Sequence, residues 1–310
     1  MTRSRGKMLV IRGGAIGDFI LTLPVFAALR SHFPETHLQV LGYPHIAHLA
    51  QAGGLVDAVR SIDARPMASF FARNGELEGN LREYFSRFSV ILSYLYDPDI
   101  IFQTNVALSS HAQFIQCPHR PDEQQRVHAT DVFLKPLEQL TIYGADPIPR
   151  LTFPAMANGS FPAGCWLALH PGSGSERKNW PERKWVELAE KLIANTDCNL
   201  LLVAGEAEGD RLDRMTASLP PGRIKCAQRL PLSELGQWLT QCKAFVGHDS
   251  GISHLAAAVA LPGVLLWGDT SEAIWRPKND KMILIREPKG LAALPVSQVF
   301  TQVNALLERL

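Results

Sequence analysis

The chain has 310 residues, of which 46% are hydrophobic and 20% are charged. This composition is typical of a globular protein with a sizeable core, and the length allows two domains of about 150 residues each. The net charge of +1 gives no electrostatic case for a nucleic-acid partner. The first 90 residues hold ten Lys and Arg against seven Asp and Glu, dispersed along the segment. This pattern excludes a polybasic membrane anchor and leaves weak peripheral contact with the cytoplasmic membrane face open.

The N-terminus does not resemble a targeting segment. Residues 1–7 are basic, and the apolar run after them is soon interrupted by Arg12 and Gly13, which makes it too short for a signal peptide or a membrane span. We therefore expect a cytoplasmic protein.

The cysteines indicate neither a metal site nor a redox site. They are odd in number, far apart and without a C-x-x-C pair: Cys117, Cys165, Cys198, Cys226 and Cys242. Because Cys165, Cys198 and Cys242 lie in or beside apolar segments, we expect buried free thiols in a reducing compartment.

The first elements predict a doubly wound α/β domain. A buried strand at residues 8–11 leads into a glycine-rich turn at 12–18, and helical periodicity follows from 19 to 32. The turn lacks the G-x-G-x-x-G spacing, and no acid ends the second strand at 37–41, which argues against a nicotinamide cofactor. Further strands are expected at 58–62, 89–95 and 111–115.

Two helical segments and one acidic pair complete this half. Residues 66–87 are polar, helical and rich in arginine, and long enough to project over a cleft. Asp97 and Asp99 resemble a metal-binding D-x-D, but a turn before a helix needs the same residues, and we favour that interpretation. An amphipathic helix is expected at 128–143.

A linker separates this half from a second α/β half. Residues 146–164 are rich in proline, glycine and small polar residues. The following strands are expected at 166–169, 199–204, 244–246, 263–267 and 282–285. A last helix at 296–309 either stays with the second half or packs back on the first. We therefore predict two domains, residues 1–155 and 156–310, each with a doubly wound parallel sheet and facing each other across a cleft.

Open parallel sheets bind ligands beyond the carboxyl ends of their strands. The loop after the strand at 244–246 places Ser250 and Gly251 at a helix entrance, where unpaired N–H groups and the helix dipole suit a phosphate. Asp249 would repel a phosphate and is assigned to neutral hydroxyls, such as those of a sugar. His254 lies one helical turn beyond Ser250. An ordinary helix cap with a buried core histidine explains this segment equally well.

A second loop, at residues 170–180, also has the composition of a phosphate site. Gly172, Ser173 and Ser175 offer backbone N–H groups and hydroxyls that can cradle a diphosphate, while Lys178 supplies positive charge. A plain turn is the alternative. The position after a strand, beside a second helix entrance, favours phosphate.

Two acids have alternative interpretations. Asp18 is either the N-cap of a helix that begins at Phe19 or a carboxylate that takes a proton from an acceptor hydroxyl. Glu208 either accepts hydrogen bonds from ribose hydroxyls or is an acid in the first turn of a helix. The residues themselves leave both pairs of alternatives open.

Taken together, the chain resembles the ADP-heptose:lipopolysaccharide heptosyltransferase family over about residues 7 to 285. The resemblance rests on motifs that occur in the family's order: residues 14–18 with 21–24, 170–172 with 178–181, 232–235, 249–258 and 267–270. Two departures stand out. Asp269 replaces the usual proline and brings an acid near the expected nucleotide pocket, and residues 66–80 match no part of the family pattern.

The resemblance implies an inverting, metal-independent glycosyltransferase of the GT-B type that needs no cofactor. Its N-terminal motif contains Gly14, Gly17 and Asp18, with the aspartate as general base, and its phosphate-binding lysine corresponds to Lys178. The donor is expected to be ADP-heptose, and the acceptor a hydroxyl of a lipopolysaccharide core or a related glycolipid or oligosaccharide. The alternatives are a transferase or epimerase for another nucleotide-diphosphate sugar and a non-catalytic nucleotide-sugar-binding protein.

Overall fold

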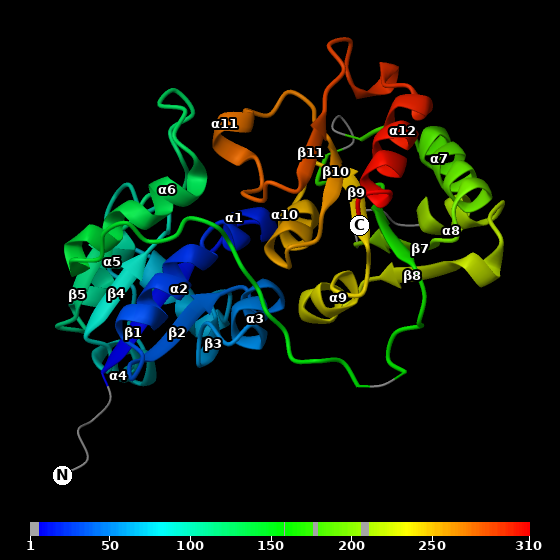
Figure 1. Cartoon of the computed structure of the whole chain (residues 1–310). Coiled ribbons are helices and arrows are strands. Elements are labelled where there is room, and N and C mark those ends of the chain that lie inside the picture. Colours follow the sequence, from blue (N-terminus) through cyan, green and yellow to red (C-terminus); the bar gives the residue numbers. More distant parts are fainter. Residues whose placement is uncertain (1–5, 158, 176–178, 206–210) are drawn as a thin grey trace. The chain divides into compact units, whose positions relative to one another are not determined.

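The computed structural model describes residues 6–157, 159–175, 179–205 and 211–310. The chain divides into two compact units, Met1–Pro147 and Ile148–Leu310. Each unit contains one parallel β-sheet with helices in its crossover connections (Figure 1). This is the arrangement expected when apolar strand runs alternate with helical periodicity. Among the described residues, no helix is both long and apolar enough to cross a membrane.

The N-terminal unit has a five-stranded sheet in the order β3-β2-β1-β4-β5. All pairings are parallel. The strands are β1 (Lys7–Arg12), β2 (His37–Gly42), β3 (Ala58–Ser61), β4 (Val90–Ser93) and β5 (Gln113–Gln116). Because the strand order reverses between β1 and β4, their carboxyl ends form the switch point at which such sheets bind ligands.

The helices of this unit differ from the expected ones in three places. They are α1 (Ile16–Ile20), α2 (Leu23–His32), α3 (Pro44–Ala52), η1 (Arg65–Phe71), α4 (Gly79–Ser86), α5 (Ile101–Ala107), α6 (Ala129–Leu134) and η2 (Lys135–Leu140). The helix expected at 19–32 is two helices, of which the first already begins at Ile16. The helix expected at 128–143 also divides, because Pro136 lacks the N–H group that would continue α6.

The segment at residues 66–87 does not project as a long helix. It forms the 3₁₀ helix η1 and, after an irregular stretch, the short helix α4. Met67, Phe70, Leu81 and Phe85 are buried in the core of the N-terminal unit. The expectation was wrong because this polar segment also contains apolar residues on one face, and these pack against the strands of the sheet.

The C-terminal unit has a six-stranded parallel sheet in the order β11-β10-β9-β6-β7-β8. Its strands are β6 (Trp166–His170), β7 (Asn199–Ala204), β8 (Ile224–Gln228), β9 (Ala244–His248), β10 (Gly263–Leu266) and β11 (Met282–Ile285). Its helices are α7 (Glu182–Asn195), α8 (Arg211–Thr216), η5 (Pro221–Arg223), α9 (Leu232–Leu239), α10 (Gly251–Ala258), α11 (Glu272–Trp275), η6 (Leu291–Ala293) and α12 (Val296–Leu307). The edge strand β8 was missed, because it is only five residues long and Lys225 and Gln228 interrupt its apolar residues.

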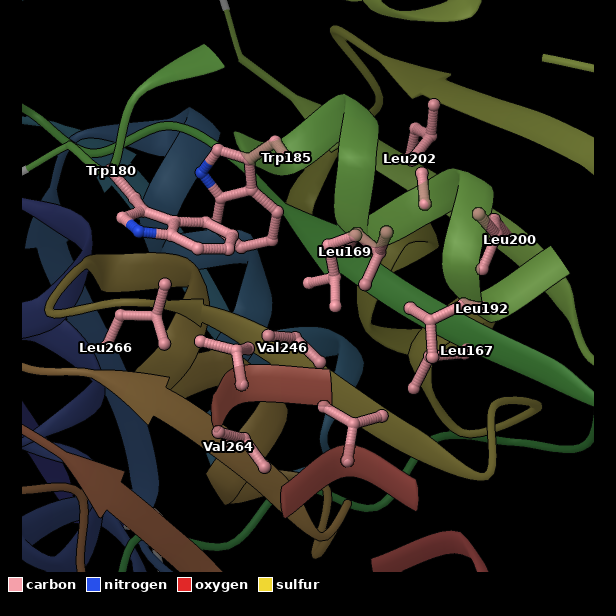
Figure 2. Packing of buried hydrophobic residues seen from close by; sticks show 14 of the residues in the cluster. Leu167, Leu169, Trp180, Trp185, Leu192, Leu200, Leu202, Val246, Val264 and Leu266 are labelled. Carbon is pink, nitrogen blue, oxygen red and sulfur yellow. The ribbon is translucent and has the colours of Figure 1, made fainter. Parts of the chain in front are cut away.

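The core of the C-terminal unit lies between its sheet and the helices α7 and α12. Figure 2 shows leucines and valines of β6, β7, β9 and β10 in this cluster, together with the indole rings of Trp180 and Trp185. The two indole rings pack edge to face, with their centres 5.4 Å apart. Helix α12 contributes Val299 and Val303 to the same cluster. It therefore packs within the C-terminal unit rather than back on the N-terminal one.

Two of the cysteines that were expected to be free form a disulfide. Cys165 and Cys198 are bonded, while Cys117, Cys226 and Cys242 are free thiols. The pairing follows from the sheet, because each cysteine directly precedes one of the adjacent parallel strands β6 and β7. The backbone N–H of Asn199 donates to the Cys165 carbonyl at 2.7 Å, which holds the two strand starts together.

Candidate functional site

The loop between β9 and α10 has the features expected of a helix-entry anion site. Ser250 is the N-cap of α10, and its hydroxyl oxygen accepts the backbone N–H of Ser253 at 3.4 Å. The same oxygen is 3.3 Å from Nδ1 of His170 at the end of β6. Asp249, Ser250 and Gly251 are all partly exposed. The cap interpretation is therefore correct, and the entrance is partly exposed, as access for an anion requires.

His254 has the environment of a core residue. It is 5% exposed, and its backbone N–H donates to the Ser250 carbonyl at 3.3 Å, which places it one turn into α10. Its burial favours the structural interpretation over direct contact with a ligand.

The loop after β6 folds on itself through Ser173. The Ser173 hydroxyl oxygen lies 2.7 Å from both the Ser175 carbonyl and the Asn179 side-chain oxygen. Gly172 and Ser173 are buried, whereas Ser175 is exposed. Ser173 therefore shapes the loop from inside, and Ser175 is the hydroxyl on the open side. Lys178, like Glu208 in the loop after β7, lies outside the described residues.

His248, which the sequence analysis did not single out, connects the two loops. Its Nε2 accepts the backbone N–H of Trp180 at 2.8 Å, and its Nδ1 is 3.2 Å from the Gly172 carbonyl, to which it donates. The ring is fully buried and meets the Trp185 indole edge to face. Its position at the end of β9, directly before Asp249, is the sequence signal that could have identified it.

Burial keeps both histidines at this sheet edge neutral. Desolvation lowers the pKa of His248 to about 4. Desolvation also lowers the pKa of His170 to about 3, with further contributions from His248 and Arg211. A neutral ring at position 248 can donate with one nitrogen and accept with the other, which is what its two contacts require.

In the N-terminal unit, the turn after β1 presents Asp18. Ala15 is the N-cap of α1, and Asp18 is the third helical residue, so the expected N-cap role before Phe19 is wrong. The carboxylate accepts the Ala15 backbone N–H at 3.3 Å and remains 31% exposed. Gly14 has φ +96°, a conformation that suits glycine, and a side chain there would approach the Asp18 carboxylate. The helix starts early because this glycine turn reverses the chain.

Gly17 contributes to this turn through its backbone. It is the second residue of α1 and is partly exposed, and its carbonyl accepts the Leu21 N–H at 2.9 Å. It lies beside Asp18 in the sequence, so the N-terminal motif presents its glycines and its acid from one short turn at the switch point.

The acidic pair at 97 and 99 is used within the N-terminal unit. The Asp97 carboxylate accepts the backbone N–H groups of Phe102 and Gln103 at 3.2 and 3.0 Å. Asp99 forms an ion pair with Arg73 at 3.3 Å. In the described ranges, no group of three or more histidine, cysteine, aspartate or glutamate side chains could hold a metal. These contacts favour the helix-start interpretation.

Comparisons with known proteins agree with this arrangement. The family description "Glycosyltransferase family 9 (heptosyltransferase)" matches residues 155–295, which include both loops of the C-terminal unit. A putative glycosyltransferase of Haemophilus influenzae is 24% identical and covers 97% of this chain and 95% of its own length. Lipopolysaccharide heptosyltransferase 3 of Escherichia coli is 23% identical, with 94% and 96% covered.

The chain is a glycosyltransferase whose residues 155–295 match family 9. Solved structures show that it has the GT-B type of fold. ADP-heptose lps heptosyltransferase II of Escherichia coli superimposes with a TM-score of 0.75 at 18% identity, covering 98% of this chain and 99% of its own. Heptosyltransferase WaaC of Escherichia coli with ADP gives 0.73 at 18% identity, with 97% and 99% covered. In this glycosyltransferase, Asp269 is exposed in a turn that Trp267 Nε1 closes by donating to Thr270 O at 2.8 Å.

Proposed function

We propose that this glycosyltransferase moves a heptose from ADP-heptose to a hydroxyl group of a lipopolysaccharide core or a related bacterial glycan. The observation that carries the proposal is the pair of loops at the carboxyl ends of β6 and β9, joined by His248. They combine a helix entrance at Ser250 with a serine- and glycine-rich turn, which is the chemistry that a diphosphate needs. Solved structures of similar fold were obtained with ADP and with ADP-2-deoxy-2-fluoro heptose.

In the proposed reaction, Asp18 takes the proton of the acceptor hydroxyl. The acceptor oxygen attacks the anomeric carbon in line, the bond from that carbon to the diphosphate oxygen breaks, and ADP leaves with the electron pair. The α10 entrance, the loop at 170–175 and Lys178 stabilise the charge that develops on the leaving group. Asp249 is assigned to sugar hydroxyls and Glu208 to ribose hydroxyls of the donor.

A donor panel with detection of products by mass tests the overall assignment. ADP-heptose, UDP-sugars and GDP-sugars are offered with and without isolated core glycans. Transfer from ADP-heptose to a core glycan is expected. Turnover of a UDP-sugar alone would support an epimerase instead, a class whose UDP-N-acetylglucosamine 2-epimerase members share this fold with a TM-score of 0.56.

Asp18→Asn tests the base. Asparagine can still accept the Ala15 N–H but cannot take a proton, so transfer should fall at least about 10²-fold while ADP affinity stays at the parental value. Asp122→Asn is the matched control, because Asp122 is an exposed acid of the same unit that caps the Gln124 N–H. Near-parental turnover of Asp18→Asn would refute the mechanism and leave the donor assignment intact.

Lys178→Ala tests the diphosphate site. Loss of a charged hydrogen bond should weaken ADP binding about ten- to a hundredfold by calorimetry. Lys191→Ala is the control, since Lys191 is a partly exposed lysine of α7 that pairs with Glu187 one turn away. Unchanged ADP affinity in Lys178→Ala would remove this lysine from the site.

A further inference from the structure

Arg12 is a buried cation at the switch point of the N-terminal sheet. It ends β1 and is 2% exposed. Its guanidinium lies 4.5 Å from the centre of the Phe133 ring and 5.6 Å from that of Tyr94. Burial lowers the pKa of Arg12 from its ordinary value, and Asp18 opposes this effect. Burying a charge costs free energy, so the contacts of Arg12 indicate what offsets that cost.

Those contacts join two loops that follow different strands. Nη1 donates to the carbonyl of His119, just beyond β5, at 2.8 Å. Nη2 donates to the Asp18 carbonyl at 3.2 Å and lies 3.9 Å from the Asp18 carboxylate. Thr22 also donates to the Asp18 carbonyl, at 2.8 Å. One guanidinium therefore fixes the backbone of Asp18 and faces its negative charge.

A purely structural role does not require a charge here. A neutral donor could satisfy the His119 carbonyl, and replacing buried ions with well-packed apolar groups is often neutral or stabilising. In addition, Arg12 Nε is buried and has no hydrogen-bond partner among the described residues. The chain thus keeps a charged side chain here although its Nε lacks a hydrogen-bond partner among the described residues. The carboxylate that this charge faces is that of Asp18.

We propose that Arg12 is a positioning residue for the transfer reaction, which holds the backbone of Asp18 and directs its carboxylate toward the acceptor hydroxyl. This proposal rests on the proposed function of Asp18 as the base. The guanidinium bond to the Asp18 carbonyl restricts where the carboxylate can lie, and the bond to the His119 carbonyl fixes the guanidinium itself.

The effect of Arg12 on Asp18 must be distinguished from its effect on the other titratable groups around them. Desolvation raises the pKa of Cys117 to about 12 and that of Tyr94 well above its ordinary value, so both stay neutral in the working range. The pKa of His119 is lowered by burial, Arg12 and Arg120, although Asp18 raises it. His119 is therefore a titratable side chain that also responds to the charge of Arg12. Arg12 contacts only its backbone carbonyl, so His119→Gln can remove the imidazole without removing that bond.

The test compares Arg12→Gln with Arg12→Lys, each in the full-length protein and each also with His119→Gln. Glutamine keeps a donor for the His119 carbonyl but removes the charge. In Arg12→Gln, kcat should fall about tenfold, with unchanged KM for the donor and unchanged ADP affinity. The loss of kcat should persist with His119→Gln.

Arg12→Lys keeps the positive charge but loses the planar, two-bond geometry of the guanidinium. It should recover only part of the parental kcat, because lysine cannot make two directed bonds at once. Arg87→Met is the control: Arg87 is an exposed arginine at the end of α4 that pairs with Glu83, and its loss should leave kcat at the parental value. Parental kcat in Arg12→Gln, or a loss confined to KM and ADP affinity, would overturn the proposal.

Two outcomes separate this proposal from the proposed function. If Asp18→Asn keeps turnover, the base assignment fails and Arg12 has no base to position. If Asp18→Asn loses turnover while Arg12→Gln keeps the parental kcat, only the role of Arg12 fails. Should Arg12→Gln not fold, as judged by circular dichroism, Arg12→Lys carries the test, and parental kcat in that variant would overturn the directing role.

Discussion

Nε2 of His248 accepts the backbone N–H of Trp180 at 2.8 Å, across 68 residues of sequence. The other ring nitrogen bonds the Gly172 carbonyl at 3.2 Å. The segment between Gly172 and Trp180 thus begins and ends on a single buried ring, which also terminates β9. His248 therefore couples the loop after β6 to the loop after β9 that contains Asp249 and Ser250.

Removing the ring should affect both stability and nucleotide binding. His248→Ala leaves the Trp180 N–H buried without a partner and opens a cavity, so unfolding free energy should fall by about 2–4 kcal/mol. ADP affinity should fall with it, because the loop loses both anchors. His248→Gln, which can donate and accept, should restore part of each property. His48→Ala, at an exposed histidine bonded to the Gln51 side chain, should change stability by less than about 0.5 kcal/mol. Parental ADP affinity in His248→Ala would limit this ring to a core role.

Stability should depend on pH through the same histidine. The pKa of His248 is about 4 in the folded chain against an ordinary value of 6.5, so between these values the unfolded chain binds more protons. The stabilisation is fully present above about pH 6.5 and is lost as pH falls toward 4, by roughly 3 kcal/mol. Melting temperatures from pH 7.5 to 4.5 should fall less steeply in His248→Gln than in the parent. Parallel curves would contradict this assignment.

Transfer should not require a divalent cation. Activity should survive excess chelator, because the acids at 97 and 99 are already used by the α5 backbone and by Arg73. Asp97→Ala should cost about 1 kcal/mol of stability, the value of a lost helix cap, with turnover kept at permissive temperature. Complete loss of activity on chelation, restored by Mg²⁺ or Mn²⁺, would contradict this prediction.

The bond between Cys165 and Cys198 should stabilise the C-terminal unit. It closes a loop across a sequence separation of 33 residues, and the chain-entropy estimate for such a loop is about 3–4 kcal/mol. Oxidised parent should therefore melt higher than Cys165→Ser, and reductant should remove the difference. Cys226→Ser, at an exposed free thiol, is the control. Peptide mapping without reductant should recover the two cysteines in one linked fragment; equal melting temperatures with and without reductant would refute the stabilisation.

The sequence alone determined the alternation of strands and helices, and it placed the expected site residues in loops beyond the carboxyl ends of strands. Continuous apolar runs such as those of β6, β7 and β9 are typical of strands buried on both faces, and the glycine- and serine-rich segments after them are typical of anion-binding turns. The linker and the last helix followed from composition and periodicity in the same way. These are local signals, which need no knowledge of distant contacts.

The tertiary structure decided every feature that depends on residues far apart in the chain. The start of α1 at Ile16, the broken segment at 66–87 and the edge strand β8 depend on packing that overrides local propensity. The Cys165–Cys198 bond depends on the pairing of β6 with β7. The burial of Arg12 against the loop after β5, and of His248 between two loops, likewise arises only when parallel strands bring their carboxyl ends to one edge. Periodicity cannot reveal these contacts, because it reports which face of an element is apolar and not which distant residue that element meets.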